Sequence, residues 1–105
     1  MAGALRQFVV THDGAVNNLG TLFPADAGTP LRELIFTQQG AAAAYIGEAG
    51  NATGALTSTN YALSIPASAA REVRISAVGA TPLKLKDLEV LGTNTQKLSI
   101  AGIAF

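Results

Sequence analysis

Apolar and polar residues alternate through much of the segment 61–93, and this alternation constrains the fold more than any other feature of the sequence. It is clearest over 71–78, where Val73, Ile75 and Ala77 share one side of an extended chain and polar residues take the other. A period of two is typical of a half-buried β-strand, because successive side chains point to opposite faces. The pattern therefore predicts a strand over 71–78 that turns its apolar side toward a core.

Turn-forming residues divide the rest of the chain into short segments rich in strand formers. Residues 31–37 also have helical spacing, and 41–47 contain four alanines, but we interpret both as strands. The loop 21–30 holds two prolines, which exclude a helix or a central strand across it. The phase of alternation changes near Lys86, which indicates a bulge or corner, and Gly102 is expected to break the last strand. The expected strands cover 6–11, 31–37, 41–47, 60–65, 71–78, 83–90 and 96–105.

These segments predict an all-β fold, a single small β-sandwich or barrel-like domain of about seven or eight short antiparallel strands. A chain of 105 residues is long enough for one domain with one small core. We assign that domain to residues 6–105. Residues 1–5 are small and apolar without periodicity, so we expect an extended N-terminal arm there.

Charged residues make up only 13% of the chain, about half the usual share, and 49% of residues are apolar. This low charge content fits two interpretations. In one, the protein is a monomer whose surface is covered by small residues. In the other, which we favour, partner subunits cover part of the surface. The net charge of zero argues against nucleic-acid and membrane partners. The start of the chain does not resemble a signal peptide, so we expect synthesis in the cytoplasm.

No pattern in the sequence indicates catalysis. His12 is the sole histidine and cysteine is absent, so neither a metal site nor a nucleophile with its base is expected. His12 itself is interpreted as a turn residue beside Asp13. Basic residues at 71, 74, 84 and 86 alternate with acidic ones, which fits either an interface or an ordinary solvated surface. We expect a non-enzymatic protein with no catalytic residue, no cofactor, no metal and no small-molecule substrate.

The C-terminal part, about residues 43–105, resembles small β-sandwich proteins of tailed-bacteriophage virions. Three motifs carry the resemblance: Tyr45-Ile46-Gly47, the LSIPA segment at 63–67 and the LKDLEVLGT segment at 85–93, followed by the hydrophobic end 98–105. The resemblance implies a capsid decoration, or cement, protein on the virion surface. Its partners would be the major capsid protein and copies of itself, commonly in a homotrimer.

Residues that could contact those partners lie in the charge-poor segments. The candidates are Leu5, Leu22, Phe23 and Tyr45, each of which could equally belong to the core. The arm 1–5 and the loop 48–59 are expected to reach onto neighbours. Two alternatives stay open: a tail, neck or fibre-attached β-domain of the virion, and a carbohydrate-binding module. The second is disfavoured because tryptophan is absent and aromatic residues are only 6% of the chain.

Overall fold

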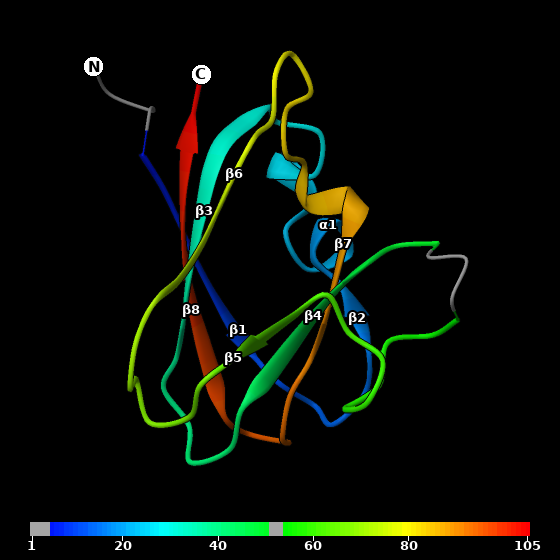
Figure 1. Cartoon of the computed structure of the whole chain (residues 1–105), viewed down its shortest axis with the longest axis vertical. Coiled ribbons are helices and arrows are strands. Elements are labelled where there is room, and N and C mark those ends of the chain that lie inside the picture. Colours follow the sequence, from blue (N-terminus) through cyan, green and yellow to red (C-terminus); the bar gives the residue numbers. More distant parts are fainter. Residues whose placement is uncertain (1–4, 51–53) are drawn as a thin grey trace.

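Two four-stranded antiparallel sheets face each other in the computed structural model, which describes residues 5–50 and 54–105 (Figure 1). The expected small all-β sandwich is confirmed. The elements in chain order are β1 (Leu5–Thr11), β2 (Asn17–Asn18), α1 (Leu19–Leu22), the 3-10 turn η1 (Pro24–Asp26), β3 (Leu31–Gln38), β4 (Ala44–Glu48), β5 (Leu63–Ile65), β6 (Val73–Ser76), the 3-10 turn η2 (Leu85–Asp87), β7 (Leu88–Leu91) and β8 (Lys97–Ala104).

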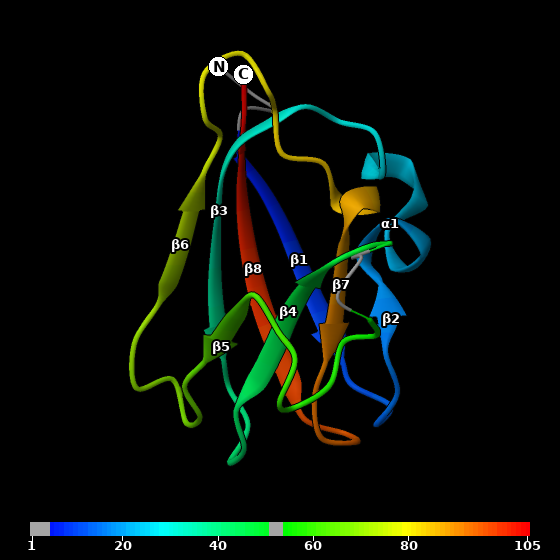
Figure 2. The same cartoon turned by 45° about the vertical axis from the view of Figure 1, so that its right-hand side comes forward.

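Sheet A has the strand order β1-β8-β3-β6, and sheet B has the order β2-β7-β4-β5. The C-terminal strand β8 therefore lies inside sheet A, where it pairs with β1 and with β3. The edge strands β1 and β2 lie on one side of the sandwich, and β6 and β5 lie on the other (Figure 2). Each sheet consequently has two free edges.

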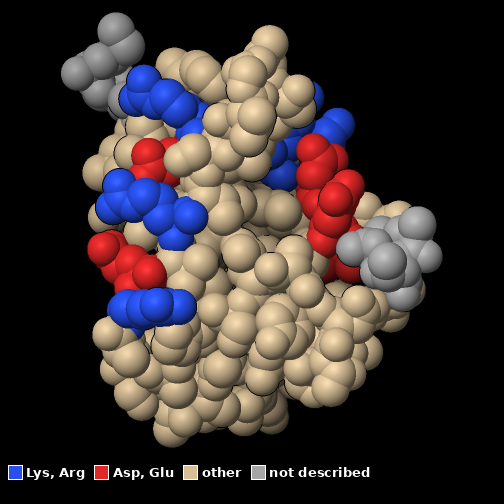
Figure 3. Space-filling model, in the orientation of Figure 1, with Lys and Arg blue, Asp and Glu red and all other residues tan. Residues whose placement is uncertain are grey.

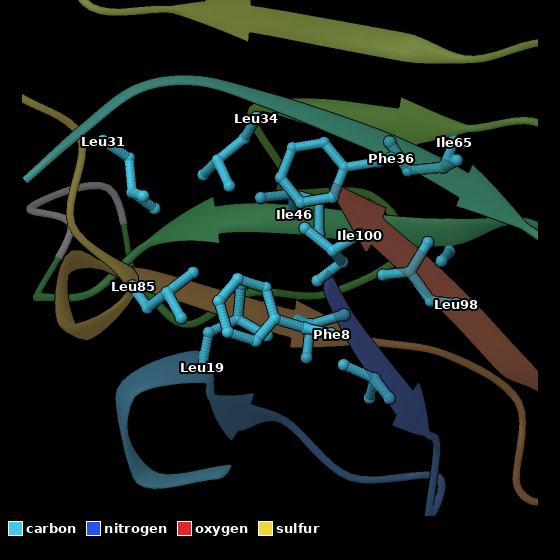
Figure 4. Packing of buried hydrophobic residues seen from close by; sticks show 13 residues of the cluster. Phe8, Leu19, Leu31, Leu34, Phe36, Ile46, Ile65, Leu85, Leu98 and Ile100 are labelled. Carbon is cyan, nitrogen blue, oxygen red and sulfur yellow. The ribbon is translucent and has the colours of Figure 1, made fainter. Parts of the chain in front are cut away.

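The core forms where the inner faces of the two sheets meet (Figure 4). Alternate residues of β1, β3 and β8 are buried, as a period of two requires. Full burial of a side chain such as Phe36 or Leu98 contributes about 1.5–3 kcal/mol. The labelled members of this cluster are Phe8, Leu19, Leu31, Leu34, Phe36, Ile46, Ile65, Leu85, Leu98 and Ile100.

Residues 21–30 form no continuous helix or strand, as expected, but short helical turns that were not expected occupy their first half: α1 ends at Leu22 and η1 covers Pro24–Asp26. The Asn18 side chain accepts hydrogen bonds from the backbone N–H groups of Gly20 and Thr21, and this caps the four-residue helix α1. Pro24 then opens the turn η1, where its missing N–H costs nothing because the first N–H groups of a helix have no partner.

Two departures from simple alternation have local causes. The phase change expected near Lys86 is real, and it is produced by the 3-10 turn η2 between Leu83, which bridges to Leu31, and strand β7. Gly102, in contrast, does not break the last strand. β8 runs unbroken to Ala104, and Gly102 lies on its buried face, where a Cβ atom would contact the side chains of Leu34 and Leu31.

Several strands are shorter than expected, because they begin two or three residues later than the apolar pattern suggested. β4 begins at Ala44, β5 at Leu63 and β6 at Val73. At the N-terminus, Leu5 is the first residue of β1 and pairs with Ile103, so it is not part of an arm. The remainder of the expected arm, 1–4, and positions 51–53 of the expected reaching loop are outside the described residues.

Candidate protein-binding surfaces

The single histidine is a buried structural residue, not a turn residue at the surface. His12 continues the inward phase of Phe8 and Val10, and only 3% of it is exposed. Its Nε2 atom lies 3.1 Å from Oε1 of Gln38, whose Nε2 donates to the carbonyl of Ala42 at 2.9 Å. That second bond orients the amide so that Oε1 accepts, and His12 therefore donates from Nε2. The pair satisfies buried polar groups and presents no reactive atom to solvent.

Residues 5–50 and 54–105 contain no group of three His, Cys, Asp or Glu side chains placed to hold a metal ion. No helix among them is long and apolar enough to cross a membrane. The features that remain are surfaces, and three of them are distinctive.

The first is an uncharged patch on the outer face of sheet A, which we call the sheet-A patch. Its residues share the outward phase of β1, β8 and β3, and cross-strand pairs bring them together, such as Gln7 beside Ala101 and Ala101 beside Ile35. Leu5 and Val9 remain 62% and 57% exposed. The patch consists of Leu5, Gln7, Val9, Ile35, Thr37, Ser99, Ala101 and Ile103.

The centre of the sheet-A patch is hollowed. A shallow depression of about 300 Å³ lies over Ala101 between the side chains of Val9 and Ile35. The small Ala101 side chain in the middle of three strands leaves room that a partner side chain could fill. Charged side chains border the patch: Glu72 lines the depression, Lys97 lies at one end of β8, and Arg74 Nη1 lies 2.7 Å from Oε1 of Glu33 on β3. A partner meeting the patch would desolvate few charged groups, which makes binding less costly.

The second surface is a cleft on the side of the sandwich where β5 and β6 are the edges. Its volume is about 490 Å³, and its walls include Ile46, Leu63, Ile75, Leu83 and Leu88. Figure 3 shows this side of the molecule, with alternating basic and acidic side chains along the left flank and acidic ones, with basic ones above them, along the right. The sandwich is thus less tightly closed on this side than on the β1 side, where the Phe8 and Phe23 rings pack with centroids 5.0 Å apart and planes tilted by 49°.

The third surface carries two tyrosines. The Tyr45 and Tyr61 rings have centroids 4.9 Å apart and planes tilted by 42°, and Tyr61 is 45% exposed. A hollow of about 380 Å³ beside Tyr45 is lined partly by the polar residues Ser58, Thr93 and Asn94.

The four predicted contact residues do not form one site. Leu5 lies on the sheet-A patch and is well exposed. Leu22 is partly exposed at the end of α1, whereas Phe23 packs against the core through Phe8. Tyr45 is half-buried on sheet B beside Tyr61. The structure thus separates these four residues among the two sheets and the α1–η1 segment.

No protein-family model, curated protein or solved structure matches this chain.

Sequence reasoning missed the sheet-A patch, although one signal was present. The outward positions of 6–11 and 96–105 are uncharged except for Lys97, which is unusual for the exposed side of a strand. Recognising a single patch also required knowing that β1 and β3 both flank β8. That arrangement joins segments from the two ends of the chain, and alternation within one segment cannot reveal it.

Proposed function

We propose that this protein is a structural component of a phage virion, a decoration protein that binds the outside of the head and stabilises contacts between major capsid subunits. The sheet-A patch is the observation that carries the proposal. It is broad, has charged side chains only along its border, and is hollowed near its centre, as expected of a surface that another protein covers. The phage assignment rests on the resemblance of residues 43–105 to small virion β-sandwich proteins.

Stabilisation of a shell by such a protein follows from mass action. A protein that binds the assembled lattice and not free subunits lowers the free energy of the assembled state. Leu5 and Val9 are the best-exposed apolar side chains of the patch, and they would lose the most solvent contact. The Ala101 hollow would receive a side chain of the capsid protein. Copies of the chain bound side by side would share each capsid contact with their neighbours.

Co-sedimentation with assembled heads tests this proposal. The unmodified protein should pellet with heads and saturate at a fixed ratio of protein to capsid subunit. Ala101→Arg places a long charged side chain in the hollow without removing a core residue, so it should weaken binding by more than about tenfold. Val78→Arg is the matched control, because Val78 lies in an exposed turn after β6. It should bind as the unmodified protein does.

Three results would overturn the proposal. Protein that stays in the supernatant has no affinity for heads. Protein that pellets only with tails belongs to a tail, neck or fibre position, the alternative position in the virion. Equal binding by Ala101→Arg and Val78→Arg would place the contact elsewhere on the protein.

A carbohydrate-binding module is the second candidate, because one observation favours it. The exposed Tyr61 ring packs at a tilt against Tyr45, which lines a partly polar hollow, and sugar sites commonly combine an aromatic ring with hydroxyl and amide groups. With no tryptophan in the chain, tyrosine fluorescence reports directly on this pair. A saturable change on titration with oligosaccharides, lost in Tyr61→Ala, would support this candidate, and an unchanged signal would remove it.

A further inference from the structure

Every second residue of β1 turns its backbone N–H and C=O groups away from β8. The His12 N–H donates to Gln96 O at 2.9 Å, and the His12 carbonyl accepts from Thr95 N at 2.8 Å. Backbone groups alternate in direction along an antiparallel strand, so the even-numbered residues of β1 share the His12 direction and the odd-numbered ones face the open edge. Within the described ranges, no hydrogen bond outside the sheet ladders reaches the backbone of the odd-numbered set. That set is Leu5, Gln7, Val9 and Thr11.

The β1 edge differs from the other three edges of the sandwich. β2 has two residues, β5 has three and β6 has four, whereas β1 has seven. β6 also lies among the charged side chains of Arg71, Glu72 and Arg74, which discourage pairing with another strand. β1 has one charged residue, Arg6, on its inward side and 3.5 Å from Asp26. A long and regular edge strand with one paired charge and with free backbone groups invites strand addition.

The strand that fits this edge is β1 itself. In an antiparallel pair of identical strands, the odd-numbered residues of one copy face those of the other, so each free N–H meets a free C=O. No other edge in the described chain is long enough to satisfy all of these groups. β1 pairs with β8 in continuous register from Leu5 to Thr11, so no bulge twists the edge away. Leu5 and Val9 of the two copies would then lie together without like-charge repulsion.

We propose that β1 pairs antiparallel with β1 of a second copy of this chain and joins the two A sheets into one continuous sheet. The pairing is two-fold symmetric and gives a dimer, unlike the trimer that the resemblance implies. Both sheet-A patches lie on the same side of the joined sheet, so they form one wider uncharged face. The dimer does not depend on the proposed function, because it is argued from the strand edge alone.

Single-cysteine variants test the contact directly, because the chain contains no native cysteine. Gln7 lies near the middle of β1, so Gln7→Cys brings two thiols close to the symmetry axis. Mild oxidation should convert this variant to a covalent dimer that a reducing agent reverses. Ser76→Cys is the matched control, since Ser76 is an exposed residue on the opposite edge strand, β6. It should form little covalent dimer at the same concentration. Equal rates for the two variants would overturn the proposal.

Sedimentation velocity of the uncross-linked protein gives an independent measurement. The unmodified chain should sediment as a dimer, and Val9→Lys, which puts a cation on each side of the axis, should raise the dimer dissociation constant by at least about tenfold. Val9→Thr keeps a β-branched side chain without charge and should still dimerise. A monomer at the highest soluble concentration, or a trimer, would overturn the proposal. Circular dichroism checks that Val9→Lys folds; if it does not, the cysteine pair decides.

Ala101→Arg separates this inference from the proposed function. Ala101 lies on β8, one strand in from the edge, so this variant should dimerise normally while it loses affinity for heads. Val9→Lys cannot separate the two proposals, because Val9 belongs to both the β1 edge and the sheet-A patch. Loss of both properties in Ala101→Arg would contradict the edge contact, because that variant leaves the backbone groups of β1 free.

Discussion

Nε2 of His12 lies 3.1 Å from Oε1 of Gln38, and together they are the buried polar pair within the core of the described chain. Gln38→Leu removes the acceptor and leaves the His12 donor unpaired in a buried position. We expect a loss of about 1–3 kcal/mol in the free energy of unfolding, measured by urea denaturation. The neighbouring Gln39 is exposed, so Gln39→Leu should change stability by less than about 0.5 kcal/mol. Equal urea midpoints for the two variants would contradict a structural role for the pair.

Gly92 leaves the space that the His12 ring occupies. A Cβ atom at position 92 would collide with that ring, so Gly92→Ala should destabilise the protein by about 1–3 kcal/mol. Gly28 has open space around it, and Gly28→Ala is the matched control with an expected change below about 0.5 kcal/mol. In a His12→Ala background the cost of Gly92→Ala should shrink, and a double-mutant cycle by thermal denaturation measures the difference. An undiminished cost in that background would show that the collision is with another group.

Asp13 should stabilise the fold at neutral pH and lose that effect in acid. The backbone N–H of Ala15 and then the side chain of Asn17 donate hydrogen bonds to its carboxylate, which lowers the pKa of Asp13 below the ordinary 3.8. A lowered folded-state pKa means that the contribution is complete above the unfolded-state value and disappears as pH falls through the folded-state value. Asp13→Ala should therefore have a lower Tm than the unmodified protein at pH 7, with the gap closing in acid. A gap that is constant with pH would contradict this account.

Asn18 joins α1 to η2 as well as capping the helix. Its Oδ1 accepts from Gly20 N at 2.8 Å, and its Nδ2 donates to the Lys86 carbonyl at 2.9 Å. Asn18→Ala removes both bonds and should cost about 0.5–2 kcal/mol in urea denaturation. Asn18→Ser retains a capping acceptor without the donor to Lys86, so its loss should be smaller. If serine and alanine cost the same, the bond to Lys86 and not the cap holds α1 in place.

The strands could be predicted from the sequence because alternation is a local signal. Ile75 and Val73 face inward as their period predicts, and the outward Arg74 pairs with Glu33 of the neighbouring strand. α1 could not be predicted in the same way, since four residues are too few to show a helical period. Asn18, a capping residue, was the local signal for α1, and Pro24, a helix-starting proline, was the signal for η1.

The environment of His12 was harder to predict, because it depends on residues far along the chain. The inward phase of Phe8 and Val10 does extend to His12, and that could have indicated burial. Only the fold brings Gln38 and Gly92 to the ring. The sheet-A patch was hard to predict for the same reason, because Gln7, Ile35 and Ala101 come from three strands that meet only after folding.

The pairing of Leu5 with Ile103 places the beginning and the end of the described chain side by side at one pole of the sandwich (Figure 1). A peptide fused at either end would project from that same pole. A short linker between the ends would also allow circular permutation, with new ends opened at the exposed turn around Gly79. Such a permutant would place β7 and β8 ahead of β1 in the chain while it keeps every strand pair. The order of the strands along the chain could then be changed without changing their order in the sheets.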